Sequence, residues 1–340
     1  MEEGTIQSAE IVVPTVDLHC HLRGTMHPGL ALELAEKHNI HLPITSVCCE
    51  YPFSGFDEFL TLYDQIGHVI KTAEDLRNVA YQYLSHVSES GTRYVEFMIS
   101  PGHSMANGIS FPSQISAISD AIDQAKSECC IAACIIVTCV RHRGPEEALE
   151  IAELAASLKS RHIRGFGITG NERLYDIGAF KGAFLVAKSM GLGLTAHTGE
   201  WLPAEAVLRA VNSLELNRVG HGIAITENVD VLAELAERKI GFEVCLSSNV
   251  ILGATKGFEL HPARKMLDAG CCMTFSTDDP AYFRTTPKQE LTLAIQHLKL
   301  TENEQRRVFE DSIEMAFCDE DTEAYLRDQA LRLESQNLAK

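Results

Sequence analysis

Short apolar runs alternate with segments of helical periodicity along this chain, and turn residues follow each run. Eight of the runs have the length and composition of buried strands: Val16–Leu22, Thr92–Ser100, Ile131–Val140, Ile163–Thr169, Gly193–His197, Arg218–Ile223, Gly241–Leu246 and Cys271–Thr277. Strands that alternate with helices predict a parallel sheet, and eight strands are enough to close a barrel. The pattern therefore favours an α/β fold of the (β/α)8 TIM barrel type with extra helices. An open doubly wound sheet gives a similar pattern and stays as the alternative.

Helix signals lie between these runs. Pro145–Leu158 repeats apolar residues at helical spacing and has proline at its first position, where a helix tolerates it. Thr72 and Asp75 match a capping box, and Gly91 is placed to end that helix just before the second strand. Two later helix starts are marked by Thr286-Pro287 with Gln289 and by Thr301 with Glu304.

Composition narrows the class of protein. No low-complexity tract or Pro/Ser-rich linker divides the 340 residues, which predicts one domain over residues 1–340. The formal net charge of −18, from 29 basic and 47 acidic residues, opposes binding to a nucleic acid or an anionic membrane and favours a small-molecule substrate. The first ten residues lack the features of a secretory signal, and no apolar run reaches the roughly 18 residues that span a bilayer. We expect a cytoplasmic protein, and the oligomeric state is not indicated.

Eleven cysteines are present, and none form a C-x2-C pair. Several are neighbours, as in Cys48-Cys49, Cys129-Cys130 and Cys271-Cys272, and others lie in strand-like runs. Adjacent residues on a strand point to opposite faces, so such pairs do not converge on one ligand. We therefore expect buried, reduced thiols, with a disulfide or cysteine-bound zinc as the alternatives.

Residues that could carry chemistry gather at the C-terminal ends of the predicted strands, where barrel enzymes place their active sites. The first strand ends in His19-Cys20-His21, and residues two apart on a strand share a face. Two convergent imidazoles are half of a metal site, although an H-x-H sequence taken alone is often incidental.

Three later strands end in comparable groups. His197 closes the fifth strand with Glu200 three residues on, and His221 stands between two glycines at the end of the sixth. Asp278 and Asp279 follow the eighth, and adjacent carboxylates are costly unless a cation or a hydrogen-bond donor uses them. Singly, these are explained as satisfied core histidines, a solvated glutamate and helix-capping acids. Together at one barrel mouth, three histidines and an aspartate suit zinc, which lowers the pKa of bound water to about 7.

These segments resemble the adenosine deaminase family of the amidohydrolase superfamily. The similar stretches span about residues 14–300, in the family's order: Asp17-Leu18-His19-Cys20-His21-Leu22, Gly170-Asn171-Glu172, His197-Thr198-Gly199-Glu200, Gly220-His221-Gly222, Glu243-Val244-Cys245 and Ser276-Thr277-Asp278-Asp279-Pro280. The resemblance implies a metal-dependent hydrolase barrel that deaminates a 6-aminopurine nucleoside. The expected reaction converts adenosine or 2'-deoxyadenosine to the inosine product and ammonia, as in purine salvage.

The resemblance also implies a metal site. One Zn2+ per subunit would be held by His19, His21, His197 and Asp278, with His21 also beside the substrate. Members of the superfamily with two metals usually place a bridging lysine on the fourth strand. This chain has no lysine in the segment from Arg164 to Gly170, which favours one metal.

Further roles follow from the same resemblance. Glu200 would deliver a proton to purine N1, and His221 would orient the attacking water or take its proton. Asp279 would accept a hydrogen bond at N7, and the backbone N–H of Gly170 would serve N3. Glu243, which would not bind the metal itself, would hold His221 in position.

Two departures from the family pattern concern the substrate. Arg23 stands where adenosine-specific members have an acid facing the ribose 5′-hydroxyl, and an arginine pairs instead with a carboxylate or a phosphate. It would bind substrate or turn to solvent. Gly167 replaces an aspartate of the adenosine-specific pattern. The alternative substrate is therefore adenine, or a 6-aminopurine nucleoside with an anionic group, such as 6-aminodeoxyfutalosine.

Two other functions compete with deamination. A catalytically inactive barrel that binds nucleosides or partners would lack Glu200, His221 or a metal ligand, and all of these are present. A binuclear amide hydrolase would need the lysine that the fourth strand does not have.

Overall fold

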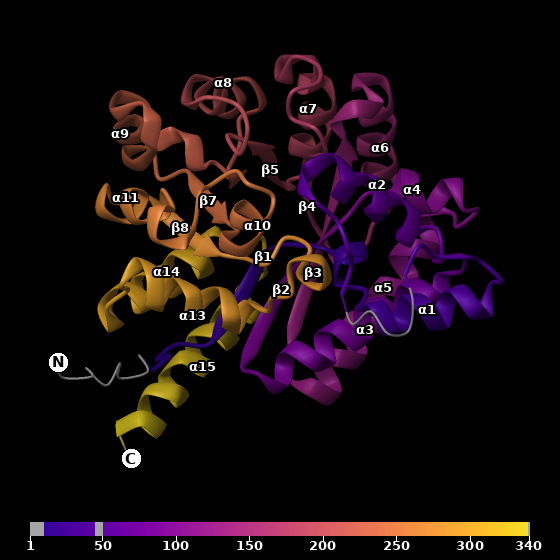
Figure 1. Ribbon diagram of the computed structural model, residues 1–340, viewed down its shortest axis with the longest axis horizontal. Helices are drawn as coiled ribbons and strands as arrows, with labels where there is room; N and C mark the ends of the chain where they lie inside the picture. The colour runs from indigo at the N-terminus through magenta and orange to yellow at the C-terminus, as the bar shows by residue number, and fades with distance from the viewer. Residues whose placement is uncertain (1–9, 45–49, 339–340) are drawn as a thin grey trace.

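The computed structural model describes residues 10–44 and 50–338. Eight parallel strands pair in chain order: β1 Thr15–His21, β2 Thr92–Ile99, β3 Ala132–Val140, β4 Ile163–Thr169, β5 Gly193–Thr198, β6 Arg218–His221, β7 Gly241–Val244 and β8 Cys272–Phe275. Helices surround them (Figure 1): α1 Pro28–Lys37, α2 Gly55–Gly67, α3 Ala73–Glu89, α4 Pro101–Ala106, α5 Phe111–Cys129, α6 Pro145–Ser157, α7 Lys181–Ser189, α8 Ala204–Leu214, α9 Val229–Glu237, α10 Leu246–Ile251, α11 Ala263–Asp268, α12 Pro280–Phe283, α13 Pro287–Leu298, α14 Glu302–Met315 and α15 Glu320–Leu338. Short 3-10 turns complete the chain: η1 Leu22–Thr25, η2 Arg141–Arg143, η3 Ile177–Phe180, η4 Ile223–Glu227 and η5 Phe258–Leu260.

The barrel closes where β1 meets the segment that follows β8. The N–H of Asp278 donates to the carbonyl of His19, and the N–H of His21 donates to the carbonyl of Asp278, both at 2.8 Å. An isolated parallel bridge joins Cys20 to Asp278 between them. The predicted barrel is thus confirmed over the open sheet, and the closing bonds hold Asp278 beside the two histidines of β1.

The predicted elements are present, and their ends differ for local reasons. β6 ends at His221 because His221 and Gly222 have φ values of 61° and 66°, which leave the strand conformation. β7 ends at Val244 because Leu246 already begins α10. The capping box predicted at Thr72 forms on α3, and the helix start marked by Thr301 and Glu304 is confirmed on α14, where these two residues also form a capping box.

Buried charges fill the barrel interior below its C-terminal mouth. The Arg218 guanidinium donates to Glu96 at 2.6 Å and to Glu243 at 2.7 Å, and all three side chains are almost fully buried. Such a cluster persists because each charge has a partner, and removing one partner costs on the order of 3–5 kcal/mol.

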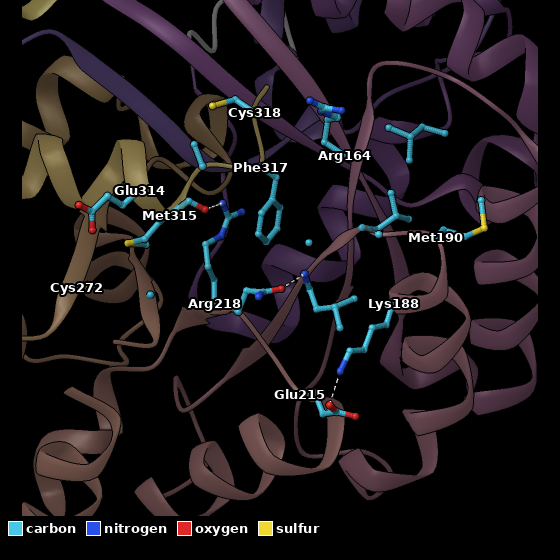
Figure 2. Close-up of a pocket in the computed structure, with 18 of the residues that line it drawn as sticks. Arg164, Lys188, Met190, Glu215, Arg218, Cys272, Glu314, Met315, Phe317 and Cys318 are labelled. Atoms are coloured by element: carbon cyan, nitrogen blue, oxygen red, sulfur yellow. Dashed lines mark hydrogen bonds and ion pairs between the residues drawn. The ribbon is translucent and has the colours of Figure 1, made fainter. Parts of the chain in front are cut away.

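Phe317 closes the opposite end of the barrel. Its ring lies 3.7 Å from the Arg218 guanidinium carbon, in space that Gly165 and Gly193 leave free of side chains. An open hollow of about 900 Å3 lies beside it, lined in part by Arg164 and Lys188 (Figure 2). Among the described residues, both groups of potential metal ligands lie at the mouth formed by the C-terminal ends of the strands. The hollow beside Phe317 therefore does not mark the reactive site.

The described cysteines are all free thiols, and Cys48 and Cys49 lie outside the described residues. The expected burial is confirmed for Cys20, Cys134, Cys139, Cys245 and Cys271. Cys130 is exposed because it follows the last turn of α5 in a left-handed conformation, so the expectation of burial is wrong there. Within the described ranges, no helix is both long and apolar enough to span a bilayer.

Candidate active site

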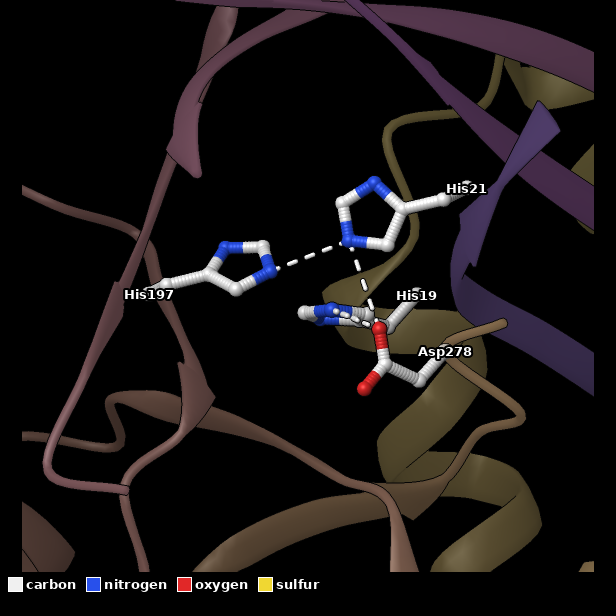
Figure 3. A group of neighbouring side chains, drawn as sticks. All are labelled: His19, His21, His197 and Asp278. Carbon is white, nitrogen blue, oxygen red and sulfur yellow. Dashed lines mark hydrogen bonds and ion pairs between the residues drawn. The ribbon is translucent and has the colours of Figure 1, made fainter. Parts of the chain in front are cut away.

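Four side chains from distant parts of the chain converge at the barrel mouth. His19 and His21 come from β1, His197 from β5, and Asp278 from the segment after β8. The Nε2 of His21 lies 3.1 Å from the Nε2 of His197 and 3.3 Å from Oδ1 of Asp278. Figure 3 shows these groups pointing toward one another, with the His19 ring beside them. One donor atom from each of the four lies within 4.8 Å of the others, so the predicted ligand set comes together.

The partners of the histidines fix which ring nitrogen is free. The Nδ1 of His19 donates to Oε2 of Glu243 at 2.7 Å, and the Nδ1 of His197 donates to the carbonyl of Ile168 at 3.0 Å. A carboxylate and a carbonyl only accept, so the lone pairs of both rings are on Nε2 and face the centre. The Nε2 of His19 is buried without a hydrogen-bond partner among the described residues.

Converging lone pairs of this kind repel one another unless a cation lies between them. Three imidazoles and one carboxylate are ligands that zinc accepts, and ligating histidines usually donate their other N–H to a carboxylate or carbonyl. The residues therefore fit a zinc ion. A second group, His221, Cys245 and Asp278, is less suitable, because burial raises the pKa of the Cys245 thiol and keeps its proton on sulfur.

The backbone at the mouth is shaped to admit these side chains. A Cβ on Gly220 would lie 2.9 Å from a carbon of the His19 ring and 3.3 Å from the His197 ring, so only glycine fits between them. His221 and Asp278 have φ values of 61° and 64°, a left-handed conformation that is rare for residues other than glycine. Strain of this kind is characteristic of functional sites.

Glu200 lies above this cluster as a protonated acid. Burial, followed by the negative charge of Asp278, raises the pKa of Glu200 to about 8. Its Oε2 is 3.9 Å from Nε2 of His221, and its Oε1 accepts a hydrogen bond of 3.1 Å from Asn249. At neutral pH this carboxyl can therefore give up a proton.

Asn249 also contacts His221, with 3.2 Å between its amide nitrogen and the Nδ1 of the histidine. Burial lowers the pKa of His221 to about 3, so the ring is neutral, and with Nδ1 accepting from Asn249 its proton is on Nε2. The expectation that Glu243 supports His221 is wrong: Glu243 contacts His19, Thr195 and Arg218.

Asn249 and Ser248 are functional candidates that the sequence reasoning missed. Ser248 donates to Oδ2 of Asp278 at 2.6 Å, which fixes that carboxylate. Both residues lie on α10, directly after β7. The polar stretch from Ser247 to Asn249 behind a predicted strand end was the available signal.

Asp279 differs from its neighbour Asp278 in charge state. Burial and then the charge of Asp278 raise the pKa of Asp279 well above its usual value, whereas His19, His21 and His221 outweigh burial and lower that of Asp278. The Oδ1 of Asp279 is buried with no hydrogen-bond partner among the described residues. The raised pKa favours the protonated carboxyl, which can donate a hydrogen bond, whereas the sequence led us to expect an acceptor.

Glu172 organises the loop that carries Glu200. Its carboxylate accepts from the backbone N–H groups of Gly199 at 2.8 Å and Leu202 at 2.9 Å, and also from Trp201. Gly170, with a φ of 92°, lies two residues before it at the same mouth.

A cavity of about 280 Å3 joins these groups. Its lining includes His21, Gly170, Glu200, His221 and Asp279, and also the metal-site residues His197 and Asp278. Its outer wall is formed by α2, with Phe56, Phe59 and Tyr63. Such a volume is at the small end for ligand sites.

Two residues expected to concern the substrate lie outside the lining of this cavity. Arg23 contacts the backbone of α2 instead. Gly167 lies inside the barrel wall, where an added Cβ would approach the Thr195 side chain to 3.0 Å and the Thr195 carbonyl to 3.2 Å. Packing on β5 therefore accounts for this glycine.

Known proteins share this sequence and geometry. The family model for adenosine deaminase matches residues 14–332. An adenine deaminase of Rhizobium rhizogenes is 37% identical over 92% of this chain and 97% of its own length. One from Chelativorans is 35% identical over 91% of this chain and 95% of its own.

Solved structures have the same fold. Adenine deaminase from Arthrobacter aurescens superposes with a TM-score of 0.89 at 27% identity, over 94% of this chain and 98% of that one. An amidohydrolase from Burkholderia ambifaria with bound zinc gives 0.86 at 27% identity, over 97% and 93%. An Arabidopsis N6-mAMP deaminase gives 0.84 at 21% identity, over 94% and 98%, which shows the fold alone. On the sequence match and the assembled site, this chain belongs to the adenosine deaminase family of the amidohydrolase superfamily.

Proposed function

We propose that the protein is a zinc-dependent adenine deaminase, which hydrolyses adenine to hypoxanthine and ammonia with one zinc ion per subunit. The observation that carries the chemistry is the convergence of the His19, His21 and His197 nitrogens on Asp278, with the buried acid Glu200 above them. Zinc bound by this set supplies a hydroxide nucleophile near neutral pH.

Proton delivery is assigned to Glu200. Addition at C6 of a purine is slow because it disrupts the aromatic ring. Protonation of N1 lowers the activation barrier because it neutralises the negative charge that develops there. A carboxyl with a pKa of about 8 holds the required proton at neutral pH. Asn249 holds its Oε1, so the acid group keeps one direction.

The attacking water is oriented by His221. Because Nδ1 accepts from Asn249, the Nε2–H of the neutral ring donates to the oxygen of the water. This arrangement favours orientation over proton removal among the two roles expected for His221.

Two contacts hold the purine ring. Asp279 keeps its proton and donates to N7, which has a lone pair and no hydrogen in the 9H form of the base. The N–H of Gly170, a residue that also lines the cavity, serves N3. Donors to both ring nitrogens recognise the aminopurine itself and need no sugar.

We assign the free base adenine, and not a nucleoside, as the substrate. The two adenine deaminases compared above by sequence align with nearly the whole chain, and the cavity is small. Adenosine, the substrate expected first from the sequence, is not supported by these relatives. The Nη2 of Arg23 donates to α2, so these two contacts give no support to a nucleoside with an anionic group.

A substrate panel tests the proposal. The zinc-loaded protein is incubated with adenine, adenosine, AMP and 6-aminodeoxyfutalosine at equal concentration, and ammonia release is measured. We expect adenine to give the highest kcat/KM. Preferential turnover of any of the other three, or no ammonia from adenine, refutes the assignment.

A further inference from the structure

Arg23 connects the strand that carries two metal ligands to the helix that covers the cavity. It lies on η1, two residues after His21, and its Nη2 donates to the carbonyl oxygens of Tyr63 at 3.3 Å and Asp64 at 3.4 Å. The guanidinium carbon is also 5.0 Å from the centre of the Tyr63 ring. Asp64 is one of the last four residues of α2, whose carbonyls lack an α-helical partner, and the partial negative charge at this end of the helix favours a cation.

Gly67, the last residue of α2, makes this contact possible. A Cβ at that position would lie 1.3 Å from Nη2 of Arg23. The guanidinium therefore lies directly against the helix backbone. Any side chain at position 67 would move either Arg23 or the end of α2.

The position of α2 determines the shape of the cavity. The helix supplies Phe56, Phe59, Leu60, Thr61, Tyr63 and Asp64 to the cavity wall. Tyr63 is thus both a wall residue and the residue whose carbonyl and ring contact Arg23. A change at Arg23 alters the wall without touching the metal ligands.

The space available to a sugar substituent depends on the same wall. In a purine whose N7 contacts Asp279, the sugar-bearing N9 is separated from N7 by one carbon. Asp279 is packed against η1, because a Cβ on Gly24 would lie 1.9 Å from its Oδ1. A group on N9 points away from Asp279 and needs space beyond the purine, and the outer wall that limits this space is formed by α2.

We propose that Arg23 is a positioning residue for selectivity: by holding the C-terminal half of α2 over the cavity, it favours the free base and excludes a ribosyl group. This inference rests on the proposed adenine deamination. A competing role exists because Nε and Nη1 of Arg23 are buried without partners among the described residues and could bind an anionic substituent. The contacts of Nη2 favour the positioning role.

The test compares Arg23→Met and Arg23→Lys with the wild type, and uses Arg238→Met, an arginine at the exposed end of α9, as the matched control. Hydrogen exchange over residues 55–67 is measured without substrate, and kcat and KM are measured for adenine, adenosine and AMP. For Arg23→Met we expect exchange in α2 to accelerate about tenfold, the usual weight of a charged hydrogen bond. We also expect the preference for adenine over adenosine to narrow about tenfold, mainly through KM.

Arg23→Lys keeps the charge and one donor, so its exchange in α2 and its selectivity should lie between those of the wild type and of Arg23→Met. It replaces Arg23→Met in the test if that variant does not fold. Unchanged exchange in α2 or unchanged selectivity in Arg23→Met overturns the inference. So does wild-type turnover of AMP that Arg23→Met loses, which would assign the guanidinium to an anion. A wild type inactive on adenine refutes the proposed function instead, because failure of the Arg23 inference alone leaves that activity intact.

Discussion

Glu243 holds the Nδ1–H of His19 across 224 positions of sequence, with 2.7 Å between nitrogen and oxygen. Although burial alone would raise its pKa, Arg218 and His19 outweigh burial and lower the pKa of Glu243 to about 2, so the carboxylate is charged. Arg218 in turn donates to the carbonyl of Met315 at the base of the barrel. The orientation of one metal ligand thus depends on a chain of contacts that runs the length of the barrel interior.

We expect Glu243→Gln to weaken zinc binding by about 10- to 100-fold, the usual effect of losing a carboxylate behind a ligating histidine. The apoprotein is titrated with zinc against a chromophoric chelator. Glu237→Gln, at an exposed position of α9, is the control and should bind as the wild type does. Thermal unfolding of both variants separates loss of the metal site from loss of the fold. Wild-type affinity in folded Glu243→Gln would exclude this support role.

Glu200→Gln should retain zinc and purine binding and lose about a hundredfold or more in kcat, because a side-chain amide cannot deliver a proton to N1. Steady-state rates with adenine, together with zinc content, provide the measurement. Near-normal turnover would remove the proton-donor assignment.

The pKa of Glu200 predicts an alkaline limit to the rate. Its folded-state pKa is raised to about 8, so the carboxyl is protonated below that value and loses its proton as pH rises through it. Because the protonated form is the active one, kcat/KM should fall above about pH 8. A cation next to Asp278 offsets part of the charge effect, but burial is the larger cause and remains. A kcat/KM profile that keeps rising to pH 10 would contradict this assignment.

Asn249→Ala should lower kcat about tenfold or more, because Glu200 and His221 both lose the amide that orients them. Zinc affinity should stay at the wild-type value, since Asn249 contacts none of the four proposed ligands in the contacts described above. Combining it with Glu200→Gln gives a double-mutant cycle, and fully additive effects would show that Asn249 does not act through Glu200.

The barrel was predictable because its strands are continuous apolar runs and its chemistry follows strand ends. The spacing of His19 and His21 indicates a shared face without any tertiary information. The ends of β6 at His221 and of β7 at Val244 were harder to predict from the sequence, because they depend on a positive φ and on the start of α10. Contacts between side chains inside the barrel were the hardest feature to predict. Glu243 and His19, for example, meet only when the barrel closes.

Electrostatic roles and the substrate wall also required the assembled fold. The raised pKa of Asp279 comes from burial next to Asp278, which no sequence spacing expresses. The place of Arg23 depends on how α2 packs over the mouth and on the room left at Gly67. From the sequence, only the chemical contrast between an arginine and an acid at position 23 could be recognised.

Zinc titration of the metal-free protein tests the central claim most directly. Adenine deamination is followed as zinc is added, for the wild type and for His197→Ala, whose ring is one of the proposed ligands. The account predicts that wild-type activity rises linearly and reaches its plateau at one zinc per chain, while His197→Ala binds zinc far more weakly. Full activity in the metal-free protein, or a plateau at two zinc ions per chain, would contradict it.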